Sequence, residues 1–264
     1  MPELPDVEAF KHYLDATSLH KSIVKTSVHD ERILSGTSPQ QLGRRLKHAT
    51  LDGSRRHGKY LFAHISKSSW LLLHFGMTGA LAYSGTEGEL PRHTRVSLDF
   101  ENGGRLAFVC QRLLGKLEVI DGVDAYIEDQ GLGPDALDER LTPEWLFEQL
   151  SSRRGSLKSG LMNQSLMAGI GNVYSDEILF HAKVHPGIPC NELSRKQVAH
   201  LLRVMQRVLR TAARHNADVE RFPSSYLTRK REKGARCPRC EGVLKTSKIS
   251  GRTAYFCPAC QKEK

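Results

Sequence analysis

Two pairs of closely spaced cysteines constrain the fold of this chain more than any other feature. They are Cys237 with Cys240 and Cys257 with Cys260, and the sixteen residues 241–256 separate the pairs. Each C-x-x-C pair can place two thiolates on one metal ion, and this spacing is typical of a zinc ribbon. Four thiolates complete a tetrahedral shell, so we predict one structural Zn²⁺ with no open position for catalysis.

The excess of positive charge is concentrated in the same part of the chain. The formal net charge is +10, and 12 basic but only 3 acidic residues lie between Arg221 and the last residue. A solvated basic tail is the simplest interpretation. However, the cysteines and the apolar pair Tyr255–Phe256 indicate that this region folds, and a folded basic module most often meets nucleic acid.

Nothing in the sequence marks secretion or a membrane span. The segment Met1–Asp6 is acidic and lacks an apolar run, and Trp70–Leu73 is too short to cross a bilayer. Disulfides are therefore not expected, and the two remaining cysteines, Cys110 and Cys190, are interpreted as packing residues. Coincidental core positions are also the alternative for the four paired cysteines.

Hydrophobic periodicity divides the chain into β-rich and helical parts. The first sixteen or so residues have helical spacing, whereas residues 23–120 contain alternating runs and a hairpin turn at Glu101–Gly104. This pattern predicts a β-sandwich or barrel. A Gly- and Asp-rich bridge, residues 121–138, then leads into predicted helices near Pro143–Ser151, Leu157–Gln164, Val173–Phe180 and Arg195–His215.

A glycine-rich turn, Met167–Asn172, interrupts these helices. A tight turn before a helix leaves backbone N–H groups free, and such groups suit a phosphate. This signal is weak by itself.

Five motifs in order along the chain are similar to one known family, the formamidopyrimidine-DNA glycosylase and endonuclease VIII family. They are Pro2–Glu8, His57–Leu61, His74–Gly79, Gly169–Tyr174 and the zinc ribbon with Gly251–Arg252 before its second cysteine pair. The resemblance spans nearly the whole chain. It implies an α+β multidomain protein with an N-terminal helix and β-sandwich (1–121), a helix-two-turn-helix domain (122–222) and a zinc finger (223–264), with DNA in the cleft between them.

The resemblance implies that Pro2 is the catalytic nucleophile, whereas its position alone suggests only a helix start. Removal of Met1 would expose a secondary α-amine. An ordinary α-amine has a pKa of about 7.7–8.0 against about 10.4 for lysine, so far more of it is neutral at pH 7. Attack on C1′ of a sugar would expel the base, and the resulting iminium would favour β-elimination and strand cleavage.

Two more residues match catalytic positions of the family. Glu3 is expected to act as acid and base, helping the deoxyribose ring to open; complementing a helix dipole is its alternative role. Lys59 is expected to contact a DNA phosphate near the lesion, although a surface turn is the simpler interpretation. Asp6 stands where the family usually has Glu.

Three donors match the family's phosphate clamp, which would hold the backbone of an extrahelical nucleotide. They are Lys158, Asn172 and Arg252. The alternatives are an N-cap role for Asn172 and solvated surface charges for the other two.

Met77, Arg112 and Leu114 match the positions that fill the duplex after base flipping. Without the resemblance, Met77 and Leu114 would be interpreted as core residues. The third position is usually Phe, and Leu113 departs from the family pattern as well, so reading of the opposite base stays open.

The sequence therefore predicts a monomeric glycosylase and abasic-site lyase, by β- or β,δ-elimination, that acts on double-stranded DNA in the cytoplasm, associated with the nucleoid. Residues 215–236 are short where many relatives carry a long loop that caps oxidised guanine. Oxidised purines, including formamidopyrimidines, and oxidised pyrimidines both remain open as substrates. A non-catalytic zinc-ribbon protein that binds damaged DNA is the competing class.

Overall fold

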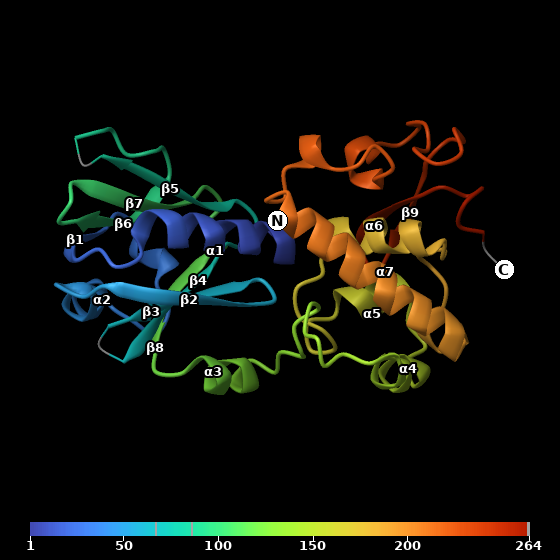
Figure 1. Ribbon diagram of the computed structural model, residues 1–264, viewed down its shortest axis with the longest axis horizontal. Coiled ribbons are helices and arrows are strands. Elements are labelled where there is room, and N and C mark those ends of the chain that lie inside the picture. Colours follow the sequence, from blue (N-terminus) through green and yellow to red (C-terminus); the bar gives the residue numbers. More distant parts are fainter. Residues whose placement is uncertain (67, 86, 263–264) are drawn as a thin grey trace. The chain divides into compact units, whose positions relative to one another are not determined.

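The computed structural model describes residues 1–66, 68–85 and 87–262 of the chain (Figure 1). The chain divides into two compact units. The first comprises Met1–Pro2 and Asp6–Gly131, and the second comprises Glu3–Pro5 and Leu132–Lys264. The zinc-ribbon segment is counted with the second unit. The three-domain division at 1–121, 122–222 and 223–264 stays a prediction.

The first unit is a β-sandwich. Its described strands pair in two antiparallel sheets, in the orders β1-β6-β7-β5 and β2-β3-β4-β8. The strands are β1 (Ile23–Val28), β2 (Leu51–His57), β3 (Tyr60–Ile65), β4 (Ser69–His74), β5 (Gly79–Gly85), β6 (Thr94–Phe100), β7 (Gly104–Cys110) and β8 (Lys116–Ile120). The predicted hairpin turn at Glu101–Gly104 joins β6 to β7, which confirms that prediction.

Both sheets of the first unit share one apolar core. Strand alternation sends Leu61 and Ala63 of β3, and Val96 and Leu98 of β6, into the same buried cluster. Helix α1 (Leu4–Ser18) lies alongside the sheets in Figure 1 and adds Val7 and Leu14 to the cluster. Each fully buried side chain of this size contributes about 1.5–3 kcal/mol to folding.

Three short helical segments complete the described part of the first unit. Helix α2 (Pro39–Leu46) begins with a capping box between Ser38 and Gln41 and buries Leu42 and Leu46, and the 3₁₀ helix η1 (Glu31–Ile33) precedes it. Helix α3 (Val123–Asp129) covers the outer face of the second sheet, where Val123 and Tyr126 pack on Phe62 and Leu72.

The second unit is helical. Its elements are α4 (Pro143–Ser151), α5 (Leu157–Met162), α6 (Asn172–Ala182), η2 (Cys190–Glu192), α7 (Arg195–Arg214), η3 (Val219–Arg221) and η4 (Leu227–Lys230). The predicted cap is present, because the Thr142 side chain accepts a hydrogen bond from Trp145 N. Helix α7 buries Val198, Leu201, Met205 and Val208 at helical spacing.

A two-stranded ribbon, β9 (Lys245–Ile249) and β10 (Arg252–Phe256), ends the second unit. Its core joins Leu244 and the cysteines Cys237 and Cys257 to Phe180 of α6. None of the helices in the described part of the chain is both long and apolar enough to cross a membrane.

Candidate active site and metal centre

The carboxylate of Glu3 is held at the N-terminus of helix α6. Glu3 Oε2 accepts hydrogen bonds from Gly171 N at 2.7 Å and Tyr174 N at 3.1 Å, and Oε1 accepts one from Val173 N at 2.8 Å. The side chain is almost fully buried. A helix N-terminus offers unpaired N–H groups and a positive dipole end, so a carboxylate is stabilised there.

Gly171 is required for this arrangement. A Cβ atom built on Gly171 would lie 2.5 Å from Glu3 Cδ and 2.6 Å from Oε1. Since real Cβ atoms need more than 3 Å, any side chain at position 171 would displace the carboxylate. The glycine-rich turn thus serves the close approach of an anion.

That anion is not the one we expected. From the sequence, the backbone N–H groups at the Met167–Asn172 turn suited a phosphate, although the signal was weak by itself. In the structure the N–H groups of Gly171, Val173 and Tyr174 instead donate to Glu3, from a segment 168 or more residues away along the chain. The glycine-rich turn indicated a site for an anion, and in the folded protein that anion is the carboxylate of Glu3.

Pro2 and Lys59, the other predicted catalytic residues, belong to the first unit. Pro2 is half-buried and Met1 is 48% exposed. Lys59 is only 9% exposed and directly precedes Tyr60, which pairs with His74 of β4, which in turn pairs with Lys116 of β8. Lys59 therefore lies in the turn between β2 and β3, directly before an inner strand of the sheet.

The pKa of His74 is lowered by its position in this sheet. Burial, followed by the charges of Lys59 and Lys116, lowers the pKa of His74 to about 4. The imidazole is consequently neutral at physiological pH.

The three predicted duplex-filling residues come together in the first unit. Arg112 N donates to Thr78 Oγ1 at 3.1 Å, which joins the turn after β7 to the turn that carries Met77. The backbones of the two turns also meet at Gly76, where an added Cβ would lie 2.3 Å from the carbonyl of Leu114. Met77 and Leu114 are 39% and 52% exposed. They are not core residues.

Lys158 lies inside the second unit rather than on its surface. Its ammonium donates to Asp176 Oδ1 at 2.5 Å, Ser175 Oγ at 3.0 Å and the carbonyl of Asn172 at 3.1 Å. An ammonium has three protons, so these acceptors account for all of its donors. The role of Lys158 as a direct phosphate ligand stays a prediction. In this structure its ammonium donates to groups of the protein itself.

Asn172 and Arg252 lie nearer the surface. Asn172 is the first residue of α6, and its Oδ1 has no hydrogen-bond partner among the described residues. Arg252 opens strand β10, directly after the turn residues Ser250 and Gly251, and its side chain is exposed. Their roles in a phosphate clamp stay predictions.

The four predicted zinc ligands form one cluster. Among the described residues, the Sγ atoms of Cys237, Cys240, Cys257 and Cys260 lie within 4.8 Å of one another. The Cys237–Cys260 and Cys240–Cys257 Sγ separations are 3.9 and 3.5 Å. Tetrahedral Zn²⁺ with bonds of about 2.3 Å requires sulfur separations of about 3.8 Å. The donor set therefore fits one structural zinc ion.

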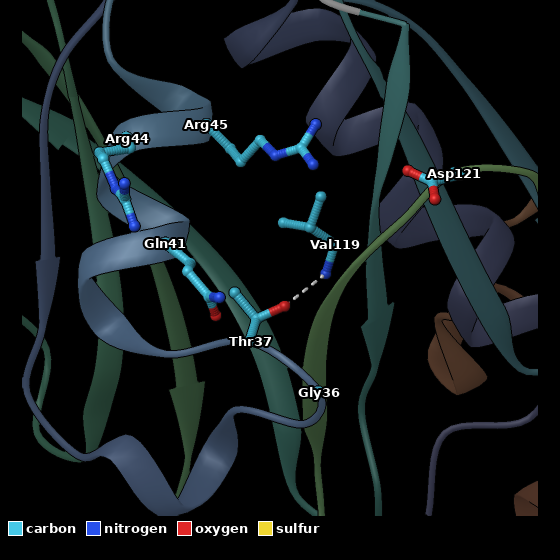
Figure 2. Close-up of a pocket in the computed structure, with 7 residues that line it drawn as sticks. All are labelled: Gly36, Thr37, Gln41, Arg44, Arg45, Val119 and Asp121. Carbon is cyan, nitrogen blue, oxygen red and sulfur yellow. Dashed lines mark hydrogen bonds between the residues drawn. The ribbon is translucent and has the colours of Figure 1, made fainter.

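A hollow of about 430 Å³ lies elsewhere in the first unit, beside α2 (Figure 2). Its lining residues are Gly36, Thr37, Gln41, Arg44, Arg45, Val119 and Asp121. No predicted site residue is among them, so this hollow does not belong to the candidate active site.

Sequence analysis missed the acidic pair that organises helix α6. Asp176 and Glu177 are both fully buried. Glu177 accepts hydrogen bonds from Leu227 N at 2.9 Å and Thr228 N at 2.7 Å, which fixes η4. Asp176 binds Lys158 and also Arg231. The available signal was two adjacent acidic residues next to the apolar run Ile178–Phe180 of the same helix.

Family models match the chain in three successive segments. They are the formamidopyrimidine-DNA glycosylase N-terminal domain over residues 1–117, the H2TH domain of the same enzyme over 132–224, and the zinc finger found in this glycosylase and in isoleucyl-tRNA synthetase over 234–262. The order is the one expected from the sequence motifs.

Curated relatives agree over the full length. The formamidopyrimidine-DNA glycosylase of Acaryochloris marina is 32% identical, with 100% of each chain covered. That of Trichormus variabilis is 34% identical, with 99% of this chain and 100% of the relative covered.

Solved structures agree as well. Lactococcus lactis formamidopyrimidine-DNA glycosylase bound to DNA with an abasic site is 28% identical and superposes with a TM-score of 0.91, covering 99% of this chain and 100% of the other. A mutant of the same enzyme bound to Fapy-dG containing DNA gives the same values. The chain therefore belongs to the formamidopyrimidine-DNA glycosylase family of base-excision-repair enzymes.

Proposed function

We propose that this protein is a bifunctional DNA glycosylase and abasic-site lyase that uses the amine of Pro2 as its nucleophile. The single observation that carries the proposal is the anchoring of Glu3 by the backbone of α6. Consecutive Cα atoms are about 3.8 Å apart, so a fixed Glu3 restricts where the neighbouring amine can lie. Such restriction is what a nucleophile needs for near-attack geometry.

The proposed reaction begins once Met1 has been removed. The neutral secondary amine of Pro2 attacks C1′, an N–C1′ bond forms, and the bond between C1′ and the damaged base breaks with its electron pair leaving on the base. Glu3 transfers the proton that accompanies opening of the deoxyribose ring. The proton that the amine loses balances the negative charge of the departing base, and the product is an iminium linking Pro2 to the ring-opened sugar.

Strand cleavage follows from the same intermediate. The iminium draws electrons from C2′, so a C2′ proton can leave, and the 3′ phosphate departs in β-elimination. Water then hydrolyses the imine and frees Pro2. This sequence accounts for both activities with one nucleophile.

Residues outside the reacting atoms are assigned to the DNA. Lys59, Asn172 and Arg252 bind phosphates around the everted nucleotide, and Met77, Arg112 and Leu114 occupy the space that the base leaves in the duplex. The four cysteines hold the zinc ion, which stabilises the ribbon bearing Arg252. A chromosomal substrate would place the protein at the nucleoid in the cytoplasm.

Two lesion classes remain as candidates. Relatives named formamidopyrimidine-DNA glycosylase, and solved complexes with Fapy-dG containing DNA, favour formamidopyrimidines and other oxidised purines. The segment after α7 favours oxidised pyrimidines, because residues 215–236 are short where many relatives carry a long loop that caps oxidised guanine.

Borohydride trapping tests the proposal. The processed, zinc-loaded protein should form a covalent adduct with a duplex that contains one abasic site. An uncleaved N-terminal extension should abolish the adduct, whereas Pro2→Gly should reduce it only in part, since glycine still offers an α-amine. Absence of an adduct with the processed protein would overturn the proposal and favour a non-catalytic binder.

A second experiment separates the two lesion classes. Duplexes that each carry one defined lesion, either a formamidopyrimidine, 8-oxoguanine or an oxidised pyrimidine, are compared under single-turnover conditions. Faster release of the purine lesions supports the first class, and the reverse order supports the second.

A further inference from the structure

Asp176 is a fully buried carboxylate that receives hydrogen bonds from separate segments of the second unit. Oδ1 accepts from Lys158 of α5 at 2.5 Å, and Oδ2 accepts from Arg231 at 2.8 and 3.1 Å and from Tyr255 N of β10 at 3.2 Å. We call Asp176, Lys158 and Arg231 the Asp176 hub. The hub thus ties α6 to α5, to the segment after η4 and to the zinc ribbon.

Both cations of the hub also reach the first turn of α6. The carbonyl of Asn172 accepts from Lys158 at 3.1 Å and from Arg231 at 3.4 Å. The N–H groups of the following residues, Val173 and Tyr174, bind Glu3. The hub therefore contacts the turn that carries Asn172 and holds Glu3.

The hub also contacts the strand that carries Arg252. Tyr255 donates its backbone N–H to Asp176 and lies three residues after Arg252 in β10, and the guanidinium of Arg231 stacks 4.4 Å from the centre of the Tyr255 ring. Arg231 therefore touches β10 on one side and α6 on the other.

Charge balance makes these contacts interdependent. Burial lowers the pKa of Lys158 and raises the pKa of Asp176, while each partner's charge opposes the shift of the other. Neither charge would be stable there without its partner. Glu3 adds a further negative charge near Lys158, so the charges alternate from Arg231 through Asp176 and Lys158 to Glu3.

We propose that Asp176 and Arg231 are positioning residues that hold Asn172 and Arg252 in register for one phosphate of the damaged strand. Lys158 acts through the hub and not as a ligand of that phosphate. This inference rests on the proposed clamp role of Asn172 and Arg252. It goes beyond that role by naming the residues that align Asn172 of α6 with Arg252 of β10.

Arg231→Met is the first test, since Arg231 is the most exposed member of the hub, at 18% of its side chain. In the processed, zinc-loaded protein, the variant should keep its zinc and its circular dichroism. It should bind a duplex with an abasic-site analogue about tenfold more weakly. Arg231→Lys should restore part of the loss, because it keeps the charge but not the planar stacking group.

Arg229→Met is the matched control. Arg229 lies in the same basic segment and bonds the carbonyl of Phe222 instead of Asp176. Its loss removes the same charge from the segment, so it should leave affinity within about twofold. An equal loss in both variants would mean that general charge is responsible, and would overturn the proposal.

A variant cycle separates positioning from mere structural support. If Arg231 acts through Asn172 and Arg252, adding Arg231→Met to the Asn172→Ala, Arg252→Ala double variant should not weaken binding further. The single variants Arg231→Met and Arg252→Ala should also each lower the slope of log affinity against log salt by about one, the loss of one phosphate contact. Additive losses, or an unchanged slope in Arg231→Met, would overturn the hub's role.

The outcomes also distinguish this inference from the proposed function. If Arg252→Ala and Asn172→Ala both leave affinity unchanged, the clamp itself is wrong and the hub falls with it. If those variants weaken binding but Arg231→Met does not, only the hub is wrong. Borohydride trapping of Pro2 remains a separate readout in either case.

Discussion

Two regions of the molecule distribute their side chains in opposite ways. In the first unit, the turns around Met77 and Leu114 leave large apolar side chains in solvent. In the second unit, helix α6 and its partners bury the charged groups of Glu3, Lys158 and Asp176. The buried charges have hydrogen-bond partners within the protein, whereas the exposed apolar side chains are available to contact a binding partner.

The difference separates what holds the fold from what meets the substrate. The buried charges are saturated by hydrogen bonds within the second unit, so their loss should damage stability and geometry. The exposed apolar residues make few contacts that folding requires, so their loss should damage DNA binding alone. The following predictions test whether the buried charges support the fold and the exposed apolar residues support DNA binding, in order of decreasing expected effect.

Asp176→Asn should lower the free energy of unfolding by about 3–5 kcal/mol, because it leaves the buried Lys158 and the half-buried Arg231 without their anion. Urea unfolding at pH 7 measures this. Combining Asp176→Asn with Lys158→Met should recover part of the loss, since one uncompensated cation is removed. A loss below about 1 kcal/mol for Asp176→Asn would break the comparison.

His74 is a half-buried titratable group of the first unit, and its imidazole is neutral there, whereas the charges of Lys158 and Asp176 are paired with each other. Its pKa of about 4 lies below the ordinary 6.5, so the unfolded chain binds more protons between these values. Stability should therefore be unaffected above pH 6.5 and fall as pH drops from 6.5 to 4, by about 3 kcal/mol in total.

The matched variant for His74 is His74→Gln, which removes the titration. Denaturant midpoints measured from pH 7 to pH 4 should show a smaller acid sensitivity in the variant than in the parent protein. Equal slopes for the two proteins would contradict the assignment of the shift to His74.

Gly171→Ala should slow borohydride trapping about a hundredfold, because the new Cβ displaces the Glu3 carboxylate beside Pro2. Stopped-flow or quenched single-turnover rates on abasic DNA measure this. Gly131→Ala is not a suitable control because of its positive φ, whereas Gly43→Ala is, since an added Cβ there meets no atom within 4 Å. A normal trapping rate for Gly171→Ala would show that the position of the Glu3 carboxylate does not matter for the reaction of Pro2.

Met77→Ala combined with Leu114→Ala should change the free energy of unfolding by less than about 0.5 kcal/mol, because both side chains are exposed. The same variant should bind abasic duplex about tenfold more weakly, since apolar wedges offset the cost of unstacking. A large loss of stability would show that both side chains contribute to the core, and would contradict the contrast between the two regions.

Features that depend on neighbours in the chain were predictable. The hairpin at Glu101–Gly104 and the Thr142 cap follow from residues a few positions apart, and the structure confirms both. The spacing of the two cysteine pairs predicted a shared site, and the four cysteines form one cluster that fits a zinc ion. Resemblance to a family added the candidate residues Pro2, Glu3 and Lys59, but it gave no contacts for them.

Features that depend on distant segments were not predictable. Lys158 resembles any surface lysine in the sequence, and nothing local indicates that it meets Asp176 eighteen positions later. The Met167–Asn172 turn suited a phosphate by its local pattern, yet the anion that its N–H groups bind is the carboxylate of Glu3. Arg231 gave only a general basic signal, although it bridges α6 and the zinc ribbon.

The sequence by itself determined the metal ligands, the helix starts, the strand alternation and the family, because each rests on short spacings or on ordered motifs. Only the tertiary structure decided which charges are buried and which apolar groups stay in solvent. Burial depends on what every distant segment contributes at one place, and the free energy of a charge there is set by those partners and not by its neighbours in the chain.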